Sequence, residues 1–181
     1  MSNYNTNMKT FISSILLGLI FLSNVSFKRP YANADDYYVV ITKSKYEMAI
    51  YQSNGTWVAT YPVVFGNKDL GDKLYEGDRR TPEGTFHIVS KRAHPKWCDF
   101  FQLDYPNQLS IQKFNERKAK GIIPYNAKIG GAIGIHGTWP NEDFAVDGMQ
   151  NWTMGCISTK NDYIKELYAT LPVGTKVTIN R

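Results

Sequence analysis

An alternation of apolar and polar residues over 37–64 is the feature that most constrains the fold of this chain. The stretch reads YYVVITKSKYEMAIYQSNGTWVATYPVV. This pattern is typical of strands that bury one face. Asn54-Gly55 supplies the residue types that a tight hairpin turn requires. The pattern predicts three consecutive strands, joined as a meander, at 37–42, 46–52 and 57–64.

The rest of the chain predicts one mainly β domain with a few helices. Apolar residues make up 43% of the sequence and charged residues 20%, which is enough apolar material for a folded core. We expect the domain to span 35–181, without internal repeats. Further strands are predicted at 85–90, 100–105, 132–137 and 174–181, and helices at 110–121 and 162–171.

The first 34 residues have the features of a secretory signal peptide. Lys9 precedes the apolar run FISSILLGLIFLSNVSF, and Ala32-Asn33-Ala34 has the small-x-small form of a cleavage site. We expect cleavage after Ala34 and an extracytoplasmic location, in the periplasm; an uncleaved membrane anchor is the alternative. Without this segment the formal net charge falls from +5 to +2, and no dense basic block remains. Nucleic-acid binding therefore has little support.

A histidine and a cysteine near the C-terminus form the candidate catalytic pair. They lie in GIHGTWPNEDFAVDGMQNWTMGCISTKND, where sixteen residues separate His136 from Thr153. His136 ends an apolar predicted strand, and Cys156 follows a loop. A thiol becomes a strong nucleophile when a nearby imidazole takes its proton. Gly155 before the cysteine permits unusual backbone angles, so N–H groups of Met154, Gly155 and Cys156 are candidates for stabilising an oxyanion. Thr153 could brace this turn.

Cys156 and His136 could instead have purely structural roles. A disulfide between Cys98 and Cys156 is compatible with export. A single buried cysteine or histidine is more often structural than functional, and we expect His87 and His94 to be structural. The sequence has no CxxC or HxxxH pattern, so no metal or other cofactor is predicted.

The residues around His136 and Cys156 resemble those of a known family. IGIHGT, the spacer and TMGCI are similar to the signature of the L,D-transpeptidase catalytic domain, also called YkuD. GDRRTPEGTFHI resembles the segment before that family's site, and KNDYIKELYATLPVGTKVTI resembles its closing helix and strand. The resemblance covers roughly 36–181.

This resemblance implies a β-sandwich-like fold and an enzyme that acts on peptidoglycan stem peptides. Cys156 would attack the carbonyl of an L-centre that is followed by a D-amino acid, forming a thioester. His136 would be the acid/base, oriented by the carbonyl of Gly137. An amine acceptor would give transpeptidation, whereas water would give carboxypeptidase or endopeptidase activity.

Two departures from the family pattern affect substrate recognition. Ser158 stands where many members carry arginine or asparagine, and Met154 stands where a histidine or another polar residue is common. We expect Ser158 to lie at the position that meets the substrate, with Arg79 or Arg80 as a replacement cation. Trp139 and Trp152 lie in the loop between base and nucleophile, and we expect them at the mouth of the groove that binds the substrate.

Other functions remain open from the sequence. A papain-like hydrolase normally has its cysteine before its histidine, and a sortase would need an arginine in a strand after the cysteine. A non-catalytic wall-binding domain would use four tryptophans as stacking platforms: Trp57, Trp97, Trp139 and Trp152.

Overall fold

The predicted meander forms one side of the sheet. The computed structural model describes residues 33–181, and its first three strands pair antiparallel in chain order. These are β1 (Tyr37–Thr42), β2 (Glu47–Gln52) and β3 (Trp57–Pro62). Gly55 adopts a φ of 87° in the β2–β3 turn, which its lack of a side chain permits. The meander is therefore confirmed.

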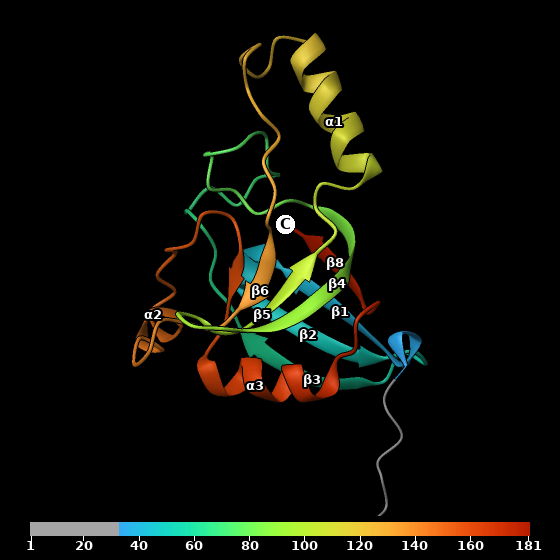
Figure 1. Ribbon diagram of the computed structural model, residues 1–181, viewed down its shortest axis with the longest axis vertical. Coiled ribbons are helices and arrows are strands. Elements are labelled where there is room, and N and C mark those ends of the chain that lie inside the picture. The colour runs from blue at the N-terminus through green and yellow to red at the C-terminus, as the bar shows by residue number, and fades with distance from the viewer. Residues whose placement is uncertain (1–32) are drawn as a thin grey trace, which may run out of the picture. The chain divides into compact units, whose positions relative to one another are not determined.

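Five further strands complete an eight-stranded sheet in the order β3-β2-β1-β8-β4-β5-β6-β7. The last strand of the chain, β8, is inserted parallel to β1 and antiparallel to β4. The long β4 pairs with β8 through its first half and with β5 through its second half (Figure 1). The bounds of these strands are β4 (Gly84–His94), β5 (Cys98–Leu103), β6 (Gly134–His136), β7 (Ile157–Ser158) and β8 (Lys176–Asn180).

The two ends of this strand order meet. Val64, just after β3, forms an antiparallel bridge with Ser158 in β7, through hydrogen bonds of 2.8 and 2.9 Å. The sheet therefore folds over on itself, and its inner side chains form one core. Buried members from strands far apart in sequence include Val39, Ile50, Phe86, Phe101, Ile135, Ile157 and Val177. The expected mainly β, sandwich-like class is confirmed.

Helices lie outside this sheet. The predicted helices correspond to α1 (Gln108–Ala119) and α3 (Asn161–Thr170). Asn107 caps α1 by accepting from Ser110, and Gly121 follows it with a φ of 66°. The short α2 (Phe144–Asp147) was not predicted, because four residues are too few for a helical period. Two 3-10 turns, Ala34–Asp36 and Lys43–Lys45, complete the elements.

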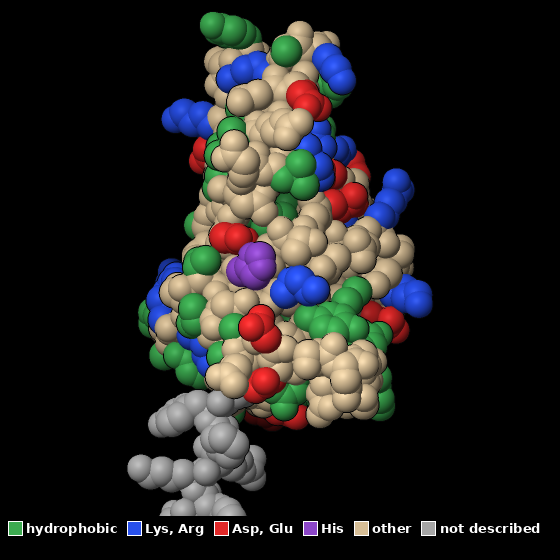
Figure 2. All heavy atoms as spheres, turned by 90° about the vertical axis from the view of Figure 1, so that its right-hand side faces the viewer, with side chains coloured by type: hydrophobic (Ala, Val, Ile, Leu, Met, Phe, Trp, Pro, Cys, Tyr) green, Lys and Arg blue, Asp and Glu red, His purple; other side chains and the backbone are tan. Residues whose placement is uncertain are grey.

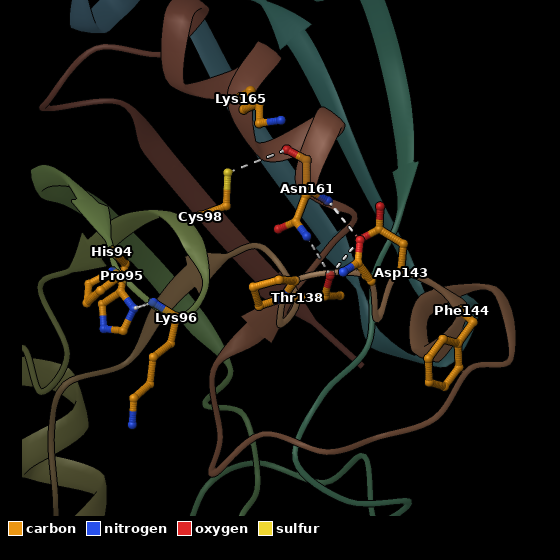
Figure 3. A pocket seen from close by; sticks show the side chains of 11 residues that line it. His94, Pro95, Lys96, Cys98, Thr138, Asp143, Phe144, Asn161 and Lys165 are labelled. Atoms are coloured by element: carbon orange, nitrogen blue, oxygen red, sulfur yellow. Dashed lines mark hydrogen bonds between the residues drawn. The ribbon is translucent and has the colours of Figure 1, made fainter.

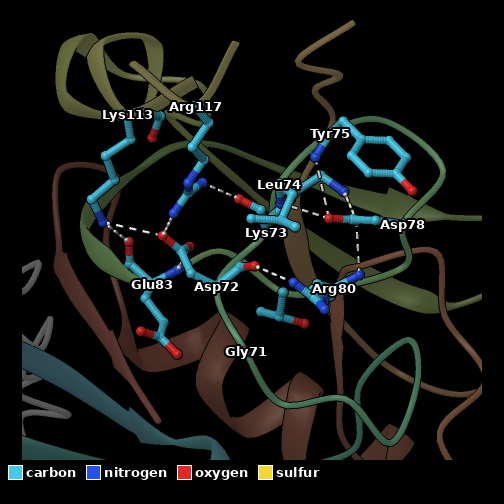
Figure 4. Close-up of polar contacts among 12 residues, drawn as sticks. Gly71, Asp72, Lys73, Leu74, Tyr75, Asp78, Arg80, Glu83, Lys113 and Arg117 are labelled. Atoms are coloured by element: carbon cyan, nitrogen blue, oxygen red, sulfur yellow. Dashed lines mark hydrogen bonds and ion pairs between the residues drawn. The ribbon is translucent and has the colours of Figure 1, made fainter. Parts of the chain in front are cut away.

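The loop between β3 and β4 is attached to α1 by ion pairs (Figure 4). Asp72 accepts from Arg117 at 2.7 Å and from Lys113 at 3.3 Å. In the same loop, Lys73 and Asp78 form a buried pair at 2.7 Å. These contacts hold in place the loop that later packs against the candidate site.

The described surface carries charges of both signs. On the face in Figure 2, basic and acidic side chains are interspersed, so that face has no continuous basic stripe. No helix within residues 33–181 is both long and apolar enough to cross a membrane. The predicted signal segment lies almost wholly outside the described residues, and its cleavage stays a prediction.

Candidate active site

His136 is the last residue of β6 and is oriented by its own backbone neighbour. The side chain is 1% exposed. Its Nδ1 lies 2.7 Å from the carbonyl oxygen of Gly137. Because a carbonyl can only accept, Nδ1 carries the proton and donates it, which leaves the lone pair on Nε2. The imidazole is thus set in the tautomer that a general base requires.

Burial keeps this imidazole neutral. Removal from water disfavours the charged ring and lowers the pKa of His136 to about 4, although the bond to Gly137 acts in the opposite direction. Aromatic rings provide this apolar environment. Trp97 and Phe100 lie nearly parallel to the imidazole, at centroid distances of 4.7 and 5.7 Å.

Cys156 lies directly before β7, which pairs parallel with β6. This pairing places the cysteine close to the strand that carries His136, although the two residues are far apart in sequence. The thiol donates to the carbonyl of Ala132, with an Sγ–O distance of 3.5 Å. Burial raises the pKa of Cys156, and the backbone N–H of Gly134 partly offsets this effect. At neutral pH the pair is therefore a neutral thiol and a neutral imidazole.

Both groups line one cavity of about 300 Å³. Its walls are mainly apolar and aromatic, as is common in ligand sites. The lining residues are Arg92, Trp97, Phe100, Gly131, Ala132, Ile133, His136, Trp152, Thr153, Met154 and Cys156. The candidate base, the candidate nucleophile and the candidate oxyanion turn thus face the same space.

The turn before Cys156 is held by Thr153. Its hydroxyl donates to the carbonyl of Cys156 at 2.8 Å and accepts the N–H of Gly155 at 3.2 Å. The Gly155 N–H is thereby engaged, which leaves those of Met154 and Cys156 as the candidate oxyanion donors. Gly155 has a φ of 123°, and a Cβ there would lie 2.8 Å from the carbonyl oxygen of Arg80. Only glycine fits this position without strain.

Ser158 lies in a different place from the one expected. The residue is 0% exposed and does not line the cavity. Its hydroxyl donates to the carbonyl of Gly137 at 3.1 Å, the same oxygen that accepts from His136. Direct contact between Ser158 and a substrate does not fit this burial. The parallel pairing of β6 and β7 places the Ser158 side chain beside the Gly137 carbonyl, which orients the imidazole.

The arginine that lines the cavity is also not one of the two expected from the sequence. Arg80 pairs with Asp69, and Arg79 donates to the carbonyl of Thr153 at 3.2 Å. Neither arginine lines the cavity, whereas Arg92 of β4 does. The sequence contained a weak signal for Arg92. The strand predicted at 85–90 could have been extended through SKRAH, which would have placed Arg92 in the sheet.

The tryptophans divide into two groups. Trp152 lines the cavity, and Trp139 packs behind it, with ring centroids 6.5 Å apart. Trp97 contacts both rings at 6.2 Å. Trp57 is 60% exposed on β3 and belongs to no such cluster. Trp97 and Trp152 therefore pack against His136, and Trp139 packs against both of them, instead of forming an open binding surface.

Cys98 belongs to a separate hollow, shown in Figure 3. Its thiol lies 3.9 Å from the carbonyl oxygen of Asn161, at the start of α3. Both cysteines are free, so the alternative of a Cys98–Cys156 disulfide is not seen. Beside Cys98, Asp143 accepts from Thr138 at 2.5 Å and from the backbone of Asn161 at 3.0 Å. This network fixes the chain that follows His136 to the N-terminus of α3.

The two other histidines do not line the cavity that holds His136 and Cys156. His94 accepts the backbone N–H groups of Lys96 and Trp97, each at 3.2 Å. His87 is exposed and lies 3.3 Å from Asp104. Within residues 33–181, no three histidine, cysteine or acidic side chains come together in a way that could hold a metal ion.

Comparison with known proteins identifies the family. The profile of the YkuD family, described as the L,D-transpeptidase catalytic domain, matches residues 36–179. This chain belongs to the L,D-transpeptidase catalytic domain family. YqjB of Bacillus subtilis (strain 168), itself assigned only provisionally as an L,D-transpeptidase, is 30% identical over 148 residues. That match covers 80% of this chain and 71% of YqjB.

Solved structures support the same L,D-transpeptidase fold. The helical cell shape determining protein Pgp2 from Campylobacter jejuni matches with a TM-score of 0.57 and 25% identity, over 79% of this chain and 46% of that one. A mutant L,D-transpeptidase from Enterococcus faecium matches with a TM-score of 0.51 and 18% identity, over 80% of this chain and 49% of that one. The chain thus spans about half the length of these two structures.

Proposed function

We propose that this YkuD domain is a cysteine enzyme that acts on L,D bonds of peptidoglycan stem peptides. The observation that carries the proposal is the single cavity shared by Cys156 and a His136 imidazole whose Nε2 is free to accept a proton. The family match supports the peptidoglycan substrate class. The same arrangement argues against a wall-binding domain without catalysis, which has no use for an oriented base beside a free thiol.

The reaction begins with two neutral groups. As Sγ of Cys156 attacks the carbonyl carbon, its proton passes to Nε2 of His136, which acts as general base. The carbonyl oxygen becomes an oxyanion, which the N–H groups of Met154 and Cys156 would stabilise. When the C–N bond breaks, the imidazolium returns the proton to the leaving amine, and a thioester remains.

The second half of the reaction decides between transfer and hydrolysis. An amine acceptor that attacks the thioester yields a new amide bond, whereas water yields a shortened stem peptide; in both cases His136 takes the proton of the attacking group. The two outcomes use the same residues. Murein L,D-transpeptidation is our first candidate, and L,D-carboxypeptidase or endopeptidase activity of the same site is the alternative.

The deciding experiment is mass spectrometry of muropeptides incubated with residues 35–181. We expect new cross-links or shortened stems with the wild type, and neither with Cys156→Ala at an unchanged melting temperature. His136→Ala should impair turnover nearly as much. Cys98→Ala is the matched control because its thiol lies in a different hollow, and it should retain activity. Turnover by Cys156→Ala would refute the thioester mechanism.

We further propose that the protein is exported, since its substrate lies outside the cytoplasm. N-terminal sequencing of exported material should begin at Asp35. Retention of the apolar segment FISSILLGLIFLSNVSF would instead indicate a membrane anchor.

A further inference from the structure

Among residues 33–181, Arg92 is the one charged side chain that lines the catalytic cavity. No aspartate or glutamate of this described part lines it, and His136 is neutral at physiological pH. The cavity therefore has a positive electrostatic character that comes from one residue. A site of this kind attracts an anionic group of its ligand.

The strand register directs Arg92 toward the catalytic pair. Arg92 in β4 is the register partner of Phe100 in β5, and Phe100 is the partner of His136 in β6. Register partners project to the same face of a sheet. Two strand spacings correspond to about 10 Å between the backbones of Arg92 and His136, a distance across which an arginine side chain and a small ligand can meet.

The Arg92 guanidinium is held in place by an aromatic ring and has no carboxylate partner among the described residues. Its central carbon lies 4.4 Å from the centroid of the Phe100 ring. A guanidinium that packs on an aromatic ring can still donate hydrogen bonds from the N–H groups at its edge. In the described part of the chain, no carboxylate pairs with Arg92, whereas Arg80 and Arg117 each have an aspartate partner.

We propose that Arg92 binds a carboxylate of the donor peptide, and that this group is the C-terminal carboxylate of the D-residue that leaves. The assignment rests on the proposed function and names the determinant of donor choice at that site. A guanidinium pairs with a carboxylate through two parallel hydrogen bonds. The terminal carboxylate is the charged group nearest to the bond that is cleaved, and the cavity of about 300 Å³ is at the small end of the range for ligand sites.

The enzyme should prefer stems whose scissile bond is the last one, because an internal bond has no carboxylate at that distance. Ser158 cannot take this role, since it is fully buried against Gly137.

The first test does not depend on any peptidoglycan activity. Alkylation of Cys156 is measured with iodoacetate and with neutral iodoacetamide, in a Cys98→Ala background that leaves one thiol. Arg92→Met should lower the iodoacetate-to-iodoacetamide rate ratio by about three- to tenfold, between the effect of an exposed ion pair and that of a charge-assisted hydrogen bond. Lys176→Met is the matched control, because Lys176 is an exposed cation that lies over the ring of Tyr38 on β8 and β1, away from the cavity. An unchanged ratio in Arg92→Met would overturn the proposal.

The second test identifies the carboxylate. Turnover is compared for a tetrapeptide donor, the same donor with a C-terminal carboxamide, and a third donor amidated on an internal carboxylate. For the wild type, the C-terminal carboxamide alone should lower kcat/KM by about three- to tenfold, and Arg92→Met should abolish that difference, with Arg92→Lys intermediate. If Arg92 discriminates only the internally amidated donor, the leaving-group assignment is wrong. If no donor is turned over, the proposed function fails, while the alkylation ratio still reports on Arg92.

Discussion

The protonation of His136 provides a quantitative test of the neutral-pair mechanism. A thiolate–imidazolium pair would hold the pKa of the histidine above its ordinary value. The buried ring in this protein has the opposite character, with a pKa lowered to about 4 from 6.5. This difference corresponds to about 3 kcal/mol of additional cost for protonating the ring in the folded protein.

The sign of the effect on stability follows from proton binding. Between pH 6.5 and about 4, the unfolded chain binds a proton at His136, whereas the folded protein does not. Lowering the pH through this window therefore destabilises the folded state, and the effect levels off below the folded pKa. From pH 7.5 to 4.5, His136 alone should lower the free energy of unfolding by about 2–3 kcal/mol.

The assay is urea unfolding of the wild type and of His136→Gln at both pH values. Glutamine does not titrate, and its amide can still donate to the Gly137 carbonyl. The pH-dependent loss of stability should be smaller in the variant by about 2–3 kcal/mol, whatever the carboxylates contribute to both proteins. NMR titration of the imidazole, assigned by its absence in His136→Gln, should show a neutral ring at pH 5. A ring that titrates near pH 6.5 or higher, or equal pH dependence in both proteins, would refute the reasoning.

Two further substitutions test the support of the site. Gly155→Ala should destabilise the protein by about 1–3 kcal/mol in urea unfolding, because alanine is strained at a φ of 123°, and should reduce turnover by displacing the oxyanion donors; normal turnover would argue against this turn as the oxyanion site. Ser158→Arg should cost more than about 3 kcal/mol, since it buries an unpaired charge, whereas Ser158→Ala should cost about 1 kcal/mol for the lost hydrogen bond. A stable Ser158→Arg protein with stronger donor binding would instead restore the role first expected for that position.

Much of the local structure could be predicted because it depends on neighbours along the chain. The alternation over 37–64 and the Asn54-Gly55 turn correspond to β1, β2 and β3, within one or two residues. The helix predicted at 162–171 corresponds to α3 (Asn161–Thr170). The motif around His136 and Cys156 predicted the family correctly, since its residue types and spacing belong to one local segment.

Features of the site that depend on contacts between distant parts of the chain could be seen only in the tertiary structure. The sequence alone determined which segments are strands and which two side chains are candidates for catalysis. Only the fold decided that Ser158 is buried against the Gly137 carbonyl and that Arg92 lines the same cavity as the thiol. Both placements follow from the pairing of β4, β5, β6 and β7, which come from widely separated parts of the chain. A local pattern cannot specify such a register, because it is selected by the shared core that forms when the two ends of the sheet meet at Val64 and Ser158.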